Sequence, residues 1–220
     1  AAAAFGRAGA PVTWCFLVTN TGGSTFTGPM VDTLPAGVTV NGTISDGGVL
    51  TGNTITWNNQ TLQGSGTYTK SGAGKLSLPG MNTFSGGTEI ADGTLEITQP
   101  SADNGGFTSI GTGPVTIRSG GTLLSSGNWT TGNEWNNGAV GKITIDQGGT
   151  WHITGVGGTI RNGLELRGGQ ITSTGQTNAD WGVLHVKSEI TATGSQSSPI
   201  AAGTALSGSR SVSVDAGSRL

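Results

Sequence analysis

The chain has 220 residues, of which 42 are glycine and only 10% are charged, and its net charge is −2. Glycine usually makes up roughly 7% of a protein, so this content is typical of a fold that turns every few residues. The near-neutral charge, with Lys and Arg scattered singly, argues against a nucleic-acid-binding protein, which needs a basic surface to displace counterions. A single cysteine, Cys15, excludes an internal disulfide, and no apolar run is long enough for a membrane helix.

Residues 1–10 are rich in alanine and lack the apolar core of a signal peptide, so they are predicted to be a linker or a processed end. From residue 11 the sequence alternates, with Val12, Trp14, Phe16 and Val18 on one face of an expected strand. Further short strands follow, with turn signals about ten residues apart. Such spacing is typical of a small β-sandwich.

Residues 19–22 (Thr-Asn-Thr-Gly) and 31–38 (Val-Asp-Thr-Leu-Pro-Ala-Gly-Val), followed by a strand with Trp57, extend this pattern. They resemble the immunoglobulin-like repeat domain of bacterial and archaeal surface proteins, whose motif reads V-T-N-T-G … D-T-L-P-A-G-V. The resemblance implies an immunoglobulin-like β-sandwich over residues 11–69.

Residues 70–95 read K-S-G-A-G-K-L-S-L-P-G-M-N-T-F-S-G-G-T-E-I-A-D-G-T-L. This stretch is similar to the passenger-associated repeat of autotransporters, approximately K-x-G-x-G-x-L-x-L-x-G-x-N-T-[YF]-x-G-G-T-x-[IV]-x-x-G-x-L. Pro79 stands where a small polar residue is commoner. The resemblance implies a right-handed parallel β-helix in a secreted or surface-displayed passenger.

A short pattern recurs through the rest of the chain: two apolar residues one apart, a Gly-rich corner and another apolar residue. Its copies fall roughly 20 to 28 residues apart, the period of a solenoid coil, and no copy can bury its apolar residues alone. The sequence therefore predicts a parallel β-helix over residues 70–220, truncated within a repeat at Leu220. Insertions at 99–107 and 127–138 are expected to form loops on one face. The copies are anchored on Ile90, Ile117, Ile145, Leu166, Val186 and Val214.

Catalytic and metal chemistry finds little support in the sequence. The acids beyond the sandwich fall one or two per coil, with no D-x-D pair, and are expected to be separate solvated charges. Sugar hydrolysis needs two carboxylates that face each other across the substrate. His152 and His185 have no partner at metal-ligand spacing and are expected to point outward from their strands. The chain is thus predicted to be no enzyme and to hold no metal or cofactor.

The tryptophans beyond residue 70 divide into two kinds. Trp151 replaces the Leu that ends the repeated motif, so it is expected in the core. Trp129, Trp135 and Trp181 lie among polar residues, Gly and Asn, and are candidates to stack on sugar rings. The alternative is that they cover a loop or the end of the coil stack.

These observations favour a non-catalytic structural segment of an extracellular or surface-displayed bacterial protein: a stalk, an adhesin or a filament component. The competing hypothesis is a carbohydrate-binding or polysaccharide-degrading β-helix, which would need acids of neighbouring coils within about 10 Å of each other on one face. Expected partners are further repeats or copies of the chain itself, since an uncapped coil has unpaired backbone groups. Cell-surface polysaccharide is a further candidate, whereas nucleic acid and membrane insertion are not expected.

Overall fold

The computed structural model describes most of the chain from residue 62 onward and separate strands before it. The positions of Cys15, Pro79 and the first predicted strand, like residues 1–10, lie outside the described residues. The described ranges are 30–34, 39–40, 44–45, 48–52, 55–57, 62–78, 82–98, 108–132, 140–155, 158–174, 183–206 and 209–220.

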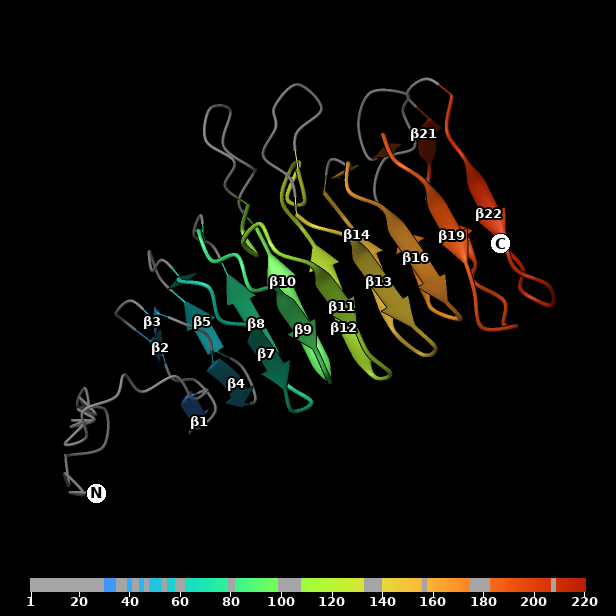
Figure 1. Ribbon diagram of the computed structural model, residues 1–220. Helices are drawn as coiled ribbons and strands as arrows, with labels where there is room; N and C mark the ends of the chain where they lie inside the picture. Colours follow the sequence, from blue (N-terminus) through green and yellow to red (C-terminus); the bar gives the residue numbers. More distant parts are fainter. Residues whose placement is uncertain are drawn as a thin grey trace, which may run out of the picture.

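All regular structure in these ranges is β, and every strand pairing is parallel (Figure 1). The large sheet contains β1(Met30–Leu34), β4(Gly48–Gly52), β7(Tyr68–Ser71), β9(Thr88–Ile90), β11(Val115–Ile117), β13(Ile143–Asp146), β16(Leu164–Arg167), β19(Ile190–Ala192) and β22(Val212–Val214). The second sheet contains β2(Thr39–Val40), β5(Ile55–Trp57), β8(Lys75–Leu78), β10(Gly93–Ile97), β12(Gly121–Ser125), β14(Thr150–Ile153), β17(Gln170–Ser173) and β20(Ile200–Ala201). Two small sheets join β15(Thr159–Ile160), β18(Leu184–Val186) and β21(Thr204–Leu206), and β3(Ile44–Ser45) with β6(Leu62–Gln63).

From β7 to β14 the chain alternates strictly between the large and second sheets. It therefore advances by one coil for each pair of strands, an arrangement consistent with a β-solenoid. From β15 onward a third sheet, made of β15, β18 and β21, is added between the second and the large sheet. The all-β, parallel architecture predicted for residues 70–220 is confirmed.

The apolar residues of successive coils form columns inside the stack. Ile90, Ile117, Ile145 and Leu166 are direct Cα partners across β9, β11, β13 and β16, and each is fully buried. Alternate residues of each strand point inward, which explains why the repeat places two apolar residues one apart. Each coil thus buries its apolar side chains only against its neighbours, as the sequence pattern requires.

The corners from the large sheet to the second sheet are short and depend on glycine. Gly93, which begins β10, has φ = 66°, a left-handed conformation that costs other residues energy. A Cβ at this position would stand 2.3 Å from the carbonyl oxygen of Gly72 and 2.5 Å from that of Gly74 in the preceding coil. The corners of adjacent coils therefore touch backbone to backbone.

The immunoglobulin-like β-sandwich predicted for residues 11–69 is not found among the described residues of that region. β1 pairs in parallel with β4, and β4 with β7, so both lie in the large sheet. β2 and β5 likewise continue the second sheet toward β8. A sandwich of this class would require antiparallel pairing. Here the strands extend the stack instead.

One anchor of the repeat was also placed wrongly. Val186 lies in β18 of the third sheet, and the residue that continues the column of Leu166 is Ala192 in β19. Leu184-x-Val186 and Ile190-x-Ala192 are both alternating apolar pairs only a few residues apart, and the sequence pattern favours the more apolar pair as the large-sheet strand. The strand that joins the large sheet is β19, which has the smaller Ala192 at the position in register with Leu166.

Candidate functional site

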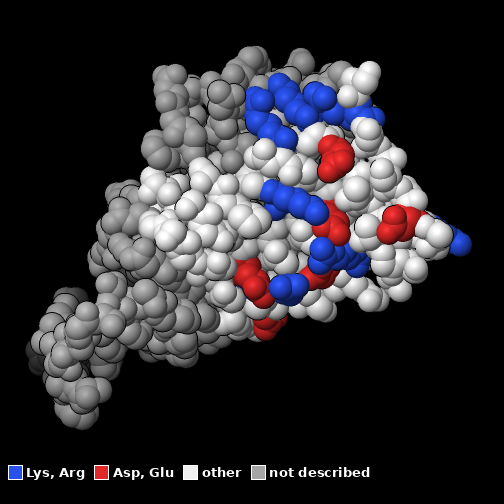
Figure 2. Space-filling model, in the orientation of Figure 1, with Lys and Arg blue, Asp and Glu red and all other residues white. Residues whose placement is uncertain are grey.

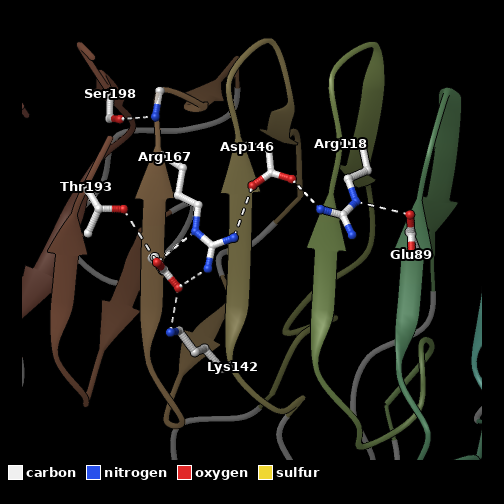
Figure 3. A network of polar contacts seen from close by, with 9 residues as sticks. Glu89, Arg118, Lys142, Asp146, Arg167, Thr193 and Ser198 are labelled. Carbon is white, nitrogen blue, oxygen red and sulfur yellow. Dashed lines mark hydrogen bonds and ion pairs between the residues drawn. The ribbon is translucent and has the colours of Figure 1, made fainter. Parts of the chain in front are cut away.

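Charged side chains form a continuous polar network over the outer face of the large sheet (Figure 3). The Arg118 guanidinium lies between two carboxylates, 3.1 Å from Glu89 Oε1 through Nε and 2.8 Å from Asp146 Oδ2 through Nη1. Asp146 also lies 3.6 Å from Arg167 Nη1. Three successive coils are joined at this position, because Ile117 is paired with Ile145 and Asp146 with Arg167.

The network continues on β16. Arg167 donates two hydrogen bonds to Glu165, at 2.8 Å from Nε and 3.1 Å from Nη2. Lys142 Nζ lies 2.6 Å from the same carboxylate. Hydrogen bonds from Arg167, together with that from Lys142, hold the pKa of Glu165 below its ordinary value of 4.5, although burial works in the opposite direction.

The acids were expected to be separate solvated charges, and this expectation was wrong for Glu89, Asp146 and Glu165. Asp146 and Glu165 lie on neighbouring coils and contact one guanidinium, that of Arg167. They thereby come within the separation that a glycosidase would need. However, a general acid needs a carboxyl group with a raised pKa, whereas that of Glu165 is lowered. The contacts themselves form an ion-pair network that links the coils of β13 and β16.

Sequence reasoning missed this network although the signal was present. The residue after the second apolar anchor is Arg118, Asp146 and Arg167 in three successive copies of the repeat. Charges of alternating sign at one repeat position lie about 4.8 Å apart along a stack of parallel strands and attract one another. Aligning the copies on their anchors would have predicted the pairing.

A smaller polar cluster lies on the second sheet. Glu96 of β10 accepts hydrogen bonds from Ser77 Oγ at 2.6 Å and Ser126 Oγ at 2.9 Å, and it lies 2.8 Å from Lys75 Nζ. Burial alone would raise the pKa of Glu96, but these hydrogen bonds hold it below 4.5. This carboxylate links three coils, those of β8, β10 and β12.

Lys70 is an inward-facing cation in the large sheet. It is 3% exposed, and it occupies the column of Ile90. Its ammonium group donates to the carbonyl oxygens of Ser71 at 2.9 Å, Gly72 at 2.6 Å and Asp92 at 3.1 Å. Burial lowers the pKa of Lys70, and the negative charge of Asp92 opposes that shift. The lysine that opens the passenger-associated motif thus ties the corners of two coils together.

Of the candidate sugar-stacking tryptophans, Trp129 alone falls within the described residues, and Trp135 and Trp181 lie outside them. Trp129 follows β12, is half-buried and has φ = 53°; its ring centroid lies 5.2 Å from that of His185 at an interplanar angle of 46°. Trp151, by contrast, is fully buried, and its Nε1 donates to Ser125 Oγ at 2.9 Å. The prediction of Trp151 as a core residue is confirmed.

The two histidines occupy different environments. His152 is half-buried on the second sheet, and its Nδ1 lies 2.7 Å from Thr172 Oγ1. His185 alternates with the core residues Leu184 and Val186, so it faces away from the core as predicted, but it is only 8% exposed and contacts Trp129. Within the described ranges no group of three His, Cys, Asp or Glu side chains could hold a metal ion. The same ranges contain no helix long and apolar enough to span a membrane.

Acidification is expected to weaken the network through Glu165. Its pKa is lowered in the folded state, so the stabilisation is present above pH 4.5 and is lost as the pH falls through the lower folded-state value. For a pair with exposed partners, the effect should be about 1 kcal/mol. Urea denaturation at pH 7 and pH 3.5 would measure it. Glu165→Gln should lose stability at pH 7 and show a smaller acid effect, whereas the exposed Glu189→Gln should behave as the parent; an unchanged acid effect in Glu165→Gln would contradict the assignment.

Comparison with known proteins agrees with the repeat motif. The model of the passenger-associated-transport-repeat family matches residues 69–97, which contain β7 to β10 except Tyr68. The chain is also 31% identical over 188 residues to the adhesin BmaC autotransporter of Brucella suis biovar 1 (strain 1330), covering 76% of this chain and 5% of that protein. No solved structure matches the chain. Residues 69–97 are therefore similar to the passenger-associated-transport repeat, and the chain has a distant relative among autotransporter adhesins.

Proposed function

We propose that this chain is a non-catalytic structural segment of a secreted or surface-displayed bacterial protein, acting as a stalk or adhesin. The observation that carries the proposal is the passenger-associated repeat at residues 69–97, whose strands β8 to β10 continue both sheets of one stack. The similarity to an autotransporter adhesin supports display outside the cell. The stack spans a small part of that relative's length, so the activity of the whole protein is part of the proposal.

We further propose that the stack is a right-handed parallel β-helix. Connections between parallel strands of one sheet are right-handed in about 98% of cases, because the strand twist favours that hand. Each coil makes such a connection between neighbouring strands of the large sheet. A rigid rod of this kind suits a stalk or a filament, since it extends over a long distance without hinges between domains.

The second candidate, a polysaccharide-degrading β-helix, is favoured by one observation: Asp146 and Glu165 meet at Arg167. The hydrogen bonds from Arg167 lower the pKa of Glu165, which argues against Glu165 as a general acid and supports the non-catalytic alternative. The test is to incubate the chain with a panel of neutral and acidic polysaccharides and to measure new reducing ends and unsaturated products. We expect no turnover with any member. Turnover that is abolished in Asp146→Asn or Glu165→Gln would overturn the structural role in favour of an enzyme.

We also propose that further coils or other copies of the chain pack against β22. Val212 and Val214 are 49% and 47% exposed there. They are the Cα partners of Ile190 and Ala192, which are buried in the preceding strand. Among the described strands β22 is the last of the large sheet, and an apolar edge strand favours pairing with another strand. The 220-residue chain should therefore associate at micromolar concentration in sedimentation velocity. Val212→Lys with Val214→Lys should shift it to monomer, whereas a parent that stays monomeric throughout would refute the contact.

A further inference from the structure

A row of cations follows the corner where the chain enters the large sheet. Each of four successive coils carries one basic residue within three residues of the start of its large-sheet strand. Figure 2 shows Lys and Arg side chains gathered along the upper edge of this face, toward the end of the stack where β21 lies in Figure 1. Backbone hydrogen bonds stack these entry segments, from Ile143 N to Gly163 O, Leu164 N to Glu189 O and Ile190 N to Ser211 O. The four basic residues are Lys142, Arg161, Lys187 and Arg210.

The two central cations follow the side of the third sheet that faces away from the apolar core, where Thr159 and His185 are themselves buried. Thr159 of β15 is the Cα partner of His185 in β18. Arg161 and Lys187 follow these residues by two positions each, so they share the same side of their strands. Both are half-buried, which anchors their aliphatic stems, whereas Arg210 on the next coil is exposed.

An aromatic ring lies against the third-sheet strand that precedes Lys187. Trp129 contacts His185 of β18, and Lys187 directly follows the end of that strand. Trp129 as a whole residue is half-buried. Trp129 thus adds an apolar surface to a row of positive charges.

The backbone at Trp129 supports a binding role. Its φ of 53° is an outlier for a bulky residue, and such outliers cluster at ligand sites where the surrounding structure imposes them. The imposing contacts are present: Thr130 and Thr131, which follow, are fully buried, and Gly132 N–H donates to the Trp129 carbonyl oxygen at 3.1 Å. The protein therefore holds the Trp129 ring in place at some conformational cost.

We propose that this corner binds a linear acidic polysaccharide, with the Trp129 ring against a sugar face and with Arg161, Lys187 and Arg210 paired to successive carboxylate or sulfate groups. Coils repeat at about 4.8 Å, which is close to the length of one hexose unit in an extended chain. Guanidinium and ammonium groups form charge-assisted hydrogen bonds with such anions. Glu189 lies in the same corner, which disfavours a ligand as densely charged as polyphosphate.

This inference deepens the adhesin role and rests on the proposed function for its biological meaning, but it can be tested separately. The probe is polygalacturonate, with binding measured by isothermal titration calorimetry at low and physiological salt. Dextran supplies a neutral sugar chain, polyphosphate supplies charge without sugar rings, and phosphatidylglycerol vesicles supply an anionic surface. The variant Arg161→Gln/Lys187→Gln removes the central cations. Its matched control is Arg219→Gln, an exposed arginine that follows β22 beyond the opposite corner.

We expect polygalacturonate to bind more weakly as salt rises, to lose at least tenfold in affinity in the double variant and to change less than twofold in the control. Trp129→Leu should weaken binding about fivefold; if that variant does not fold, the double variant decides alone. Absence of polygalacturonate binding at low salt, equal losses in the control, equal binding of dextran, or tighter binding of polyphosphate or vesicles would each overturn the proposal. Binding without cleavage supports both proposals, whereas cleavage would reject the non-catalytic role and leave the binding site standing.

Discussion

Replacing Gly93 by alanine is expected to destabilise the stack by about 3 kcal/mol. Part of this loss comes from the left-handed backbone, which costs a residue with a Cβ about 1 to 2 kcal/mol. The rest comes from overlap, because the new methyl group would stand 2.3 Å and 2.5 Å from two carbonyl oxygens of the preceding coil. The adjacent corner must therefore shift, and with it the register of β8 and β10.

Gly194 provides the matched control for this substitution. Its φ is 86°, so an alanine there meets similar backbone strain, but the nearest atom to its Cβ would be Arg167 Cα at 4.0 Å. Gly194→Ala should cost only about 1 to 2 kcal/mol. Urea denaturation followed by circular dichroism measures both. Equal losses at the two glycines would show that the corners do not touch as described.

The second large effect is expected at Trp151. Trp151→Ala removes the largest fully buried side chain among the described residues and should cost about 3 to 5 kcal/mol. Ser125→Ala keeps the indole but leaves its buried N–H without an acceptor, which should cost about 1 to 3 kcal/mol.

A double-mutant cycle separates packing from the hydrogen bond. Trp151→Leu places in this column the side chain already present at Leu95 and Leu123, which are in register with it. With leucine at 151, the further change Ser125→Ala should cost much less than it does beside tryptophan, since no indole N–H is left unpaired. An undiminished cost would mean that Ser125 stabilises the core by other contacts.

The repeating part of the fold was predictable because its signal lies within each copy. Ile90, Ile117, Ile145 and Leu166 recur at the solenoid period and indeed form one column. Such a column depends only on local alternation and on a glycine corner, both of which the sequence displays. The passenger-associated motif was read in the same way, and its Lys70 has a physical role that the pattern alone did not reveal.

The region before residue 70 was harder because its local pattern is ambiguous. Short alternating strands separated by turns about ten residues apart fit a sandwich and also fit a coil of two strands. What distinguishes them is the partner of each strand, and in the structure β4 pairs in parallel with both β1 and β7. Strand partners are set by tertiary packing, which alternation along one strand does not encode.

The contacts between polar side chains on the surface were harder to predict from the sequence than the strands or the core. Arg118 and Asp146 are 28 residues apart and meet only because Ile117 and Ile145 are paired. The contact between Trp129 and His185 joins residues from two different coils. Trp129 lies in a connection of irregular length, so its place cannot be predicted from a position in the repeat. Surface sites of a solenoid are thus built between copies, and they become visible once the register is known.

The central claim, a single stack of parallel coils in register, is tested most directly by disulfide trapping in a Cys15→Ser background. Thr116→Cys and Thr144→Cys stand opposite each other on β11 and β13, and Val49→Cys and Thr69→Cys on β4 and β7. Paired Cα atoms of neighbouring strands lie within the range that a disulfide spans. We predict that both pairs cross-link within the monomer, whereas Thr116→Cys with Thr191→Cys, three strands apart, does not. Failure of the first pair would contradict the solenoid, and failure of the second alone would restore a separate domain before residue 70.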